Sequence, residues 1–349
     1  MNDRFINPYT DYGFKKLFGT EQNADLLISF LNSLLSDNKD PIVSIAYKNV
    51  EHLGEINTMR SSYFDVFCQT ESGADFIVEM QNGKQIYFKD RSLYYATIPI
   101  QEQGKKGKAR AEAEYHALEK EPSKTEKGKE TDAVKKKGWD YHLEDVYLVA
   151  ILDFVFPGDE YPRDEYFHEI KLMDVKDKHV FYDKLTLIYL EMPKIEDLEV
   201  RLDTMRDKWM YALYSLCYTD EQPPELGEEI FRKLFEEARL ANFNERQLFS
   251  YQMSLKDLWD SYSTWKCANQ EGLEQGKELG IAEGKTLGIA EGKELGIAEG
   301  KTLGIAEGKT LGIAEGKKQI ARKMLSMGMS KEAVLEATGL TEEELHGYD

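Results

Sequence analysis

The chain has 349 residues, a net charge of −19, an apolar fraction of 41% and an aromatic fraction of 11%, so it has room for one sizeable domain plus appendages. No stretch is apolar for long enough to span a bilayer, and residues 1–16 lack the apolar run of a signal peptide. The acidic balance argues against nonspecific, salt-driven binding to DNA.

The three cysteines, Cys68, Cys217 and Cys267, lie far apart and have no zinc spacing. This usage is typical of a reducing compartment, and we expect a cytoplasmic protein without a membrane segment.

Two helices are predicted near the N-terminus. Thr10 is a candidate N-cap, and the apolar residues after it recur at helical spacing as far as residue 18. A second helix is expected over residues 24–35, followed by a strand over residues 42–47. Lys15 lies one turn after Asp11 on the same face, where it could meet phosphate or pair with Asp11.

Residues 63–81 are predicted to form a β-hairpin, because two β-prone runs flank a short polar break that ends at Gly73. If the loop has three residues and its last one, a glycine, has positive φ, the residues that face each other across the two strands have numbers that sum to 144. Asp65 would then face Glu79. Gln81 lies two residues further on and points to the same side of the strand. The sequence therefore places these three side chains on one sheet surface.

Two opposed carboxylates repel each other, and burial beside aromatic residues raises the cost. A hard divalent cation such as Mg²⁺ or Mn²⁺, held by Asp65 and Glu79, would remove both problems and leave water positions open for chemistry. The alternative is a solvated outer face of the sheet that carries acids.

A helix over residues 90–97 follows, with Arg91 and Tyr95 four residues apart on one face. Residues 104–137 then hold eleven Lys or Arg and seven Asp or Glu. This composition predicts a charged, partly disordered insertion. The insertion could contact nucleic acid, or it could be a solvent-exposed segment without a binding role.

Two nearly continuous apolar runs, over residues 146–156 and 185–191, predict strands buried on both faces. Further helices are expected over 201–218, 228–241 and 245–265. In the last of these, Trp259, Tyr262 and Trp265 form an apolar stripe, which predicts core packing or a dimer contact.

From residue 272 to 316 a glycine occurs at every fourth position, in an octad such as GKTLGIAE. The repeat is either a flexible spacer or a long helix stabilised by self-association along its glycines, and we expect no catalytic role for it. At the end, Ser330, Gly339 and a Thr341–Glu344 capping box predict small helices. They could form a helix-turn-helix or, in their acidic surroundings, a dimerisation knob. A homo-oligomer could therefore form through the C-terminal helices.

Five segments resemble, in order, the Rpn family of recombination-promoting nucleases and transposases, a PD-(D/E)XK nuclease family. They are NPYTDYGFKKLFG (7–19), FDVFCQTESGADFIVEMQ (64–81), RSLYYAT (91–97), WDYHLEDVYLVAILDF (139–154) and LTLIYLEMPK (185–194).

The resemblance implies an α/β, restriction-endonuclease-like core over residues 1–220, with a mixed sheet flanked by helices. A helical extension over 221–268, the glycine repeat over 269–317 and a small helical unit over 318–349 would follow.

The resemblance also implies a function: a bacterial, Mg²⁺-dependent DNA endonuclease associated with recombination or mobile elements. Asp65 and Glu79 would hold the metal, and Gln81 would stand where relatives carry Lys, positioning water or phosphate. Asp11 matches the family motif and would add an acid to the site; otherwise it is a first-turn acid stabilised by the helix dipole.

The resemblance places the helix of Arg91 and Tyr95 against the active-site sheet. Arg91 is then a candidate phosphate or carboxylate partner, and Lys15 is a candidate phosphate contact. Tyr95 would lie beside the site as a substrate contact, or it would only pack in the core. The alternative function is a weak or inactive nuclease fold that acts as a binding or regulatory module through its C-terminal tail.

Overall fold

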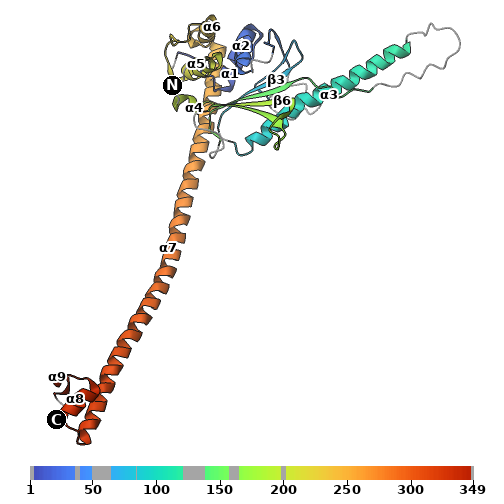
Figure 1. The fold of residues 1–349 in the computed structure, drawn as a ribbon. Helices are drawn as coiled ribbons and strands as arrows, with labels where there is room; N and C mark the ends of the chain where they lie inside the picture. The colour runs from blue at the N-terminus through green and yellow to red at the C-terminus, as the bar shows by residue number, and fades with distance from the viewer. Residues whose placement is uncertain are drawn as a thin grey trace, which may run out of the picture. The chain divides into compact units, whose positions relative to one another are not determined.

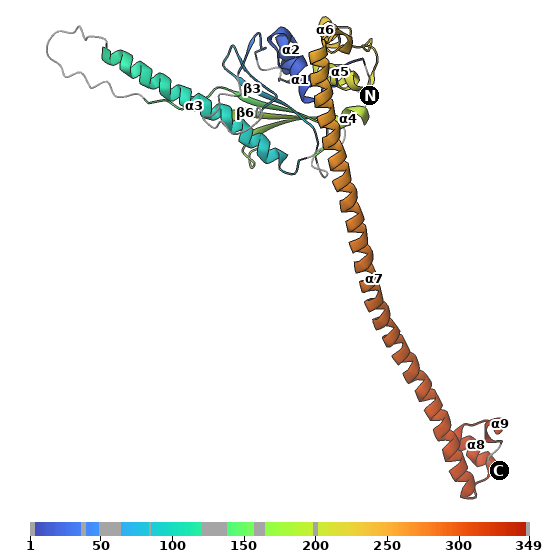
Figure 2. The ribbon, with the colours of Figure 1, turned by 180° about the vertical axis from the view of Figure 1, so that it is seen from behind.

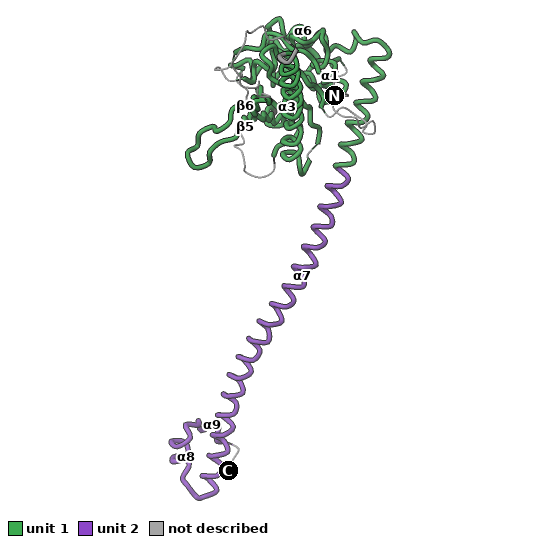
Figure 3. The backbone as a smooth tube through the Cα atoms, turned by 90° about the vertical axis from the view of Figure 1, so that its right-hand side faces the viewer, with its two compact units in different colours: residues 1–265 green, residues 266–349 purple. Residues whose placement is uncertain are grey.

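The computed structural model describes residues 4–35, 40–48, 64–83, 85–120, 138–156, 165–197 and 202–346. The chain divides into two compact units, residues 1–265 and 266–349 (Figure 3). The expected helical extension over 221–268 lies in the first unit as far as residue 265, and the glycine repeat lies in the second. Within the described residues, no helix is both long and apolar enough to cross a membrane.

A six-stranded mixed sheet forms the centre of the first unit, in the order β1-β2-β3-β4-β6-β5. β3 and β6 run parallel to β4, and the remaining neighbours are antiparallel. The strands are β1 (Ile45–Tyr47), β2 (Val66–Thr70), β3 (Asp75–Gln81), β4 (Val146–Leu152), β5 (Phe167–Met173) and β6 (Val180–Glu191). β4 is buried along its whole length, as its unbroken apolar sequence predicts.

The hairpin of β2 and β3 has the predicted register. Val66 pairs with Val78 and Phe67 with Ile77, so each pair of numbers sums to 144. Gly73 closes the loop with φ at 93°, a backbone conformation that glycine adopts without a steric penalty. The turn therefore fixes which side chains oppose each other where β2 begins.

Helices cover both faces of the sheet (Figures 1 and 2). On one face the core joins even-numbered residues of β3 to apolar residues of four helices. These are α1 (Asp11–Phe18), α2 (Ala24–Leu34), α5 (Met205–Tyr218) and α6 (Glu229–Glu237). On the other face Ile77, Leu148 and Ala150 pack against Phe88 and Ala96 of α3 (Phe88–Lys120). The short α4 (Pro193–Asp197) follows β6. The predicted α/β fold, a mixed sheet flanked by helices, is confirmed.

The expected flexible segment is wrong for residues 104–120, which continue α3. The ring of Trp139 lies against this helix at Gly104 and Gly107. A Cβ added at Gly107 would be 2.5 Å from the indole ring, so glycine permits a contact that any larger residue would block. The Glu144 amide also donates to Gln103 Oε1 at 2.9 Å. Residues 121–137 lie outside the described part of the chain.

The glycine repeat is helical, within α7 (Glu245–Ser326). Trp259, Tyr262 and Trp265 are about half exposed, so the core alternative for this stripe is wrong. In the second unit α8 (Lys331–Thr338) and α9 (Glu342–Leu345) follow the predicted caps: Ser330 accepts from the Ala333 amide, and Gly339 has φ at 62°. Val334, Leu340 and Leu345 pack on Ala321 of α7.

Candidate active site

Asp65 lies immediately before β2, opposite Glu79 by continuation of the hairpin register. Its Oδ2 accepts from the backbone amide of Met80 at 2.8 Å, and its side chain is 21% exposed. This hydrogen bond ties the carboxylate of one strand to the backbone of the other. The structure thus brings the two predicted acids to the same end of the hairpin.

Glu79 and Gln81 occupy the face of β3 that α3 covers, and both are buried. Arg91, in the first turn of α3, reaches them from above the sheet. Its Nη2 lies 3.1 Å from Glu79 Oε2 and also donates to Gln81 Oε1. Its Nη1 donates to Gln85 Oε1 at 2.6 Å. Arg91 is therefore a carboxylate partner in this structure, one of the two roles predicted for it.

The ring of Tyr95 packs against this guanidinium. Arg91 Cζ lies 5.3 Å from the ring centres of Phe88 and of Tyr95, a separation typical of cation–π contact. Tyr95 also packs edge-on against Phe64, with ring centres 5.3 Å apart. These contacts match the packing alternative for Tyr95.

Asp11 and Lys15 approach from α1. Lys15 Nζ lies 2.6 Å from Asp11 Oδ1 and 3.9 Å from Asp65 Oδ1, so the predicted pairing within α1 is present and extends toward the hairpin. Asp11 is the more exposed partner, with 64% of its side chain accessible. Its carboxylate is close enough to raise the pKa of Asp65.

The two hairpin acids hold protons more tightly than ordinary carboxyls. Burial raises the pKa of Asp65 to about 6, against the lowering effects of the Met80 amide and Lys15. Burial raises the pKa of Glu79 to about 7; Arg91 lowers it, and the neighbouring charge of Asp65 raises it further. Perturbed carboxyls that face each other are typical of functional sites.

The donor set fits a magnesium-like ion. Among the described residues, no group of three or more His, Cys, Asp or Glu side chains is arranged to hold a metal. Mg²⁺, however, is usually held by one or two carboxylates with water at its other positions. Asp65 and Glu79 supply two such groups, and a cation between them would relieve the repulsion that helps raise the pKa of Glu79.

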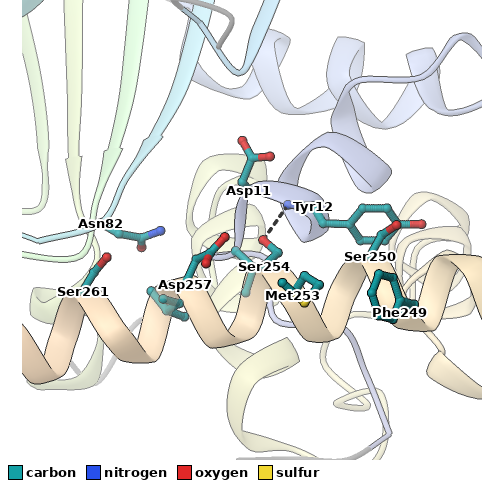
Figure 4. A pocket seen from close by; sticks show the side chains of 11 residues that line it. Asp11, Tyr12, Asn82, Phe249, Ser250, Met253, Ser254, Asp257 and Ser261 are labelled. Carbon is teal, nitrogen blue, oxygen red and sulfur yellow. Dashed lines mark hydrogen bonds between the residues drawn. The ribbon is translucent and has the colours of Figure 1, made fainter. Parts of the chain in front are cut away.

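A pocket of about 570 Å³ opens beside Asp11 (Figure 4). One wall is α1 and Asn82, which follows β3 directly. The other wall is the first part of α7, including Ser254, whose hydroxyl accepts from the Tyr12 amide at 3.0 Å. Sequence reasoning missed this wall, because Tyr12 and Ser254 are 242 positions apart. The charged side chains lining the pocket, Asp11 and Asp257, are both acidic.

Two further buried acids belong to structural networks. Asp75 is fully buried and accepts from Lys48, from Gln69 at 3.0 Å and from Gln103 at 2.9 Å. Glu191 is fully buried and accepts from the Phe156 amide; it also meets Lys194 at 2.5 Å and His168 Nε2 at 2.9 Å. Three protein groups hold each of these carboxylates, which satisfies their hydrogen-bonding capacity within the fold.

Comparisons with known proteins identify the family of the chain. Residues 8–119 and 126–268 match the profile of the PD-(D/E)XK nuclease family transposases. Residues 314–348 match the C-terminal helix-turn-helix domain of the Rpn/YhgA-like nuclease family. No curated protein and no solved structure matches the chain. Since the first match covers more than half of the sequence, the chain belongs to the PD-(D/E)XK nuclease family transposases and ends in an Rpn-type helix-turn-helix domain.

Proposed function

We propose that this protein is a metal-dependent DNA endonuclease that hydrolyses phosphodiester bonds at the Asp65–Glu79 site, with Mg²⁺ or Mn²⁺ as its ion. The observation that carries the proposal is the opposed pair of carboxylates at the end of the β2–β3 hairpin, partly buried Asp65 and buried Glu79, both with raised pKa values. Such a pair is unfavourable for stability and favourable for binding a divalent cation.

The chain's own groups would orient the reactants. The Met80 amide holds Asp65 in place, and Arg91 holds Glu79. Gln81 has no basic atom, so it can position water or phosphate by hydrogen bonding and cannot take a proton. A bound divalent ion would polarise the scissile phosphate and lower the pKa of an attacking water. Asp11 and Lys15 would meet the reacting strand from α1, with Lys15 as a phosphate contact.

DNA is the proposed substrate, although the net charge is −19. The helix-turn-helix match provides one DNA-binding element. Exposed Lys105, Lys106, Lys108 and Arg110 form a basic run on α3, which supplies a second, local concentration of positive charge. A role in recombination or in mobile elements follows from the family and is part of the proposal.

A homo-oligomer through the C-terminal helices completes the proposal. The Leu and Ile residues of the repeat from Leu279 to Ile313 are between 52% and 68% exposed, and a Cβ added at any repeat glycine would face open space. Each glycine costs a lone helix about 1 kcal/mol relative to alanine. A second copy packed along the glycines would offset this cost. In sedimentation of the full chain we expect a dimer or larger species that Ile289→Lys with Ile297→Lys dissociates; a wild-type monomer at about 50 µM would contradict it.

The test of the nuclease function is cleavage of supercoiled plasmid by the purified full chain, in Mg²⁺, in Mn²⁺ or in EDTA. Asp65→Ala and Glu79→Ala are compared with the wild type under each condition. We expect cleavage that requires the metal and that is lost in both variants. Equal cleavage by wild type and variants would place the activity elsewhere.

The Gln at position 81 favours one alternative, a nuclease fold that has become a binding module. In that case folded wild-type protein would show no cleavage in either Mg²⁺ or Mn²⁺, while DNA binding through the C-terminal domain persisted. A fluorescence-anisotropy titration with duplex DNA on the same preparation distinguishes the two.

A further inference from the structure

The amide of Gln81 is oriented by contacts on both sides. Its Nε2 donates to the carbonyl oxygens of Asn82 at 3.0 Å and of Gly83 at 3.3 Å. Its Oε1 is thereby turned away from that loop, and it accepts from Arg91 Nη2. The side chain that stands in place of a lysine therefore presents an oxygen to a cation.

Arg91 is fixed in this position by packing as well as by hydrogen bonds. Its guanidinium lies near the rings of Phe88 and Tyr95, and its two Nη atoms contact Glu79, Gln81 and Gln85. The Nε atom is buried and makes no hydrogen bond in the described structure. A buried donor without an acceptor is unfavourable, so this guanidinium retains donor capacity inside the site.

We propose that Arg91, brought in from α3, supplies the positive charge that the motif lysine supplies in relatives, and that Gln81 is the residue that positions it. The inference rests on the proposed nuclease function and names the cation of that site. Because an arginine stays protonated in proteins, its role is electrostatic: it faces the charge that develops on the phosphate, and it does not act as a base.

Lys15 is a second cation near the acids in the described part of the chain, and its position suits a different role. It lies on the Asp65 side, closest to Asp11, and its side chain is 36% exposed. Its ion-pair contacts among the described residues are with Asp11 and Asp65. A lysine introduced at position 81 would therefore restore the charge of Arg91 and not the charge of Lys15.

The two cations can be separated by rescue. The variants are Arg91→Met and Lys15→Met, each alone and each combined with Gln81→Lys in the full chain. We expect Arg91→Met to lower the cleavage rate by a factor of about 10² to 10³, as the loss of one preorganised donor does. Gln81→Lys should recover at least about a tenth of the wild-type rate in the Arg91→Met background. It should give no recovery in the Lys15→Met background.

A second readout does not depend on cleavage. Arg91 repels a divalent ion at Glu79, so Arg91→Met should bind Mn²⁺ about tenfold more tightly by calorimetry at about pH 8, and Gln81→Lys should reverse the gain. A purely structural role would not produce this pattern.

The inference is overturned if Arg91→Met cleaves within about threefold of wild type, or if Gln81→Lys fails to rescue it while melting temperatures match. If the wild type cleaves nothing, the proposed function fails by itself. The Mn²⁺ titration then decides about Arg91: tighter binding in Arg91→Met supports it as the cation of the site, and unchanged binding refutes it.

Discussion

Replacing Glu79 by Gln should stabilise the metal-free protein at alkaline pH. Burial raises the pKa of Glu79 from 4.5 to about 7, so the folded protein keeps a proton that the unfolded chain has already released. The stability that this proton provides is complete below about pH 4.5 and is lost as the pH rises through about 7. The Gln variant has no such proton and no such loss.

The magnitude follows from the two pKa values. With these two pKa values, the unfolding free energy of the wild type falls by about 2.5 kcal/mol between about pH 5 and about pH 8. The unfolding free energy of Glu79→Gln does not fall for this reason. For a domain of this size the difference corresponds to about 5–10 °C in melting temperature. Comparing the two pH values removes the steric effect of the substitution, because that effect is the same at both.

The assay is thermal or urea unfolding of both proteins in EDTA at the two pH values. Glu114→Gln, which removes an exposed acid from α3 that pairs with Arg110 at 3.0 Å, is the matched control for loss of one carboxylate. If the gap between Glu79→Gln and wild type is the same at both pH values, the raised pKa of Glu79 is wrong and with it the electrostatic basis of the site.

Metal binding should tighten as the pH rises through about 6 to 7, because Asp65 and Glu79 must lose their protons before they can act as ligands; Mn²⁺ titrations at about pH 5.5 and about pH 8 measure this, and equal affinities would contradict it. Gly107→Ala should lower the unfolding free energy, because the added Cβ meets the Trp139 ring. In a Trp139→Ala background the same change should raise the unfolding free energy by about 1 kcal/mol through helix propensity. A change of the same sign in both backgrounds, measured by urea unfolding, would show that the ring does not constrain α3. Asp75→Ala should cost about 3 kcal/mol, because it leaves the partly buried Lys48 without its counter-charge. An unfolding free energy in urea that changes by less than about 1 kcal/mol would refute the network.

The centre of the site could be predicted because its geometry is local. The three-residue loop sets the hairpin register, and the register alone opposes Asp65 and Glu79. Strand alternation then adds Gln81. The helix caps of the C-terminal unit, at Ser330 and Thr341, depend on a few neighbouring residues in the same way.

The remaining parts of the site depend on contacts that the sequence does not encode locally. Arg91 reaches Glu79 because α3 packs across the sheet, which only the tertiary fold decides. The charged composition after residue 104 predicted disorder, yet Trp139 holds the helix from a distant position. The wall that α7 adds at Ser254 comes from 242 positions away, and no periodic pattern signals such an approach.

The most direct test of the central claim is the location of a bound metal. Crystals of the full chain soaked in Mn²⁺, measured near the manganese absorption edge, would show the ion by its anomalous scattering. The account predicts a peak within bonding distance of both Asp65 and Glu79, and the loss of that peak in Glu79→Gln crystals. A peak elsewhere in the domain, or one that survives this substitution, would contradict the assignment of the hairpin carboxylates as the metal site.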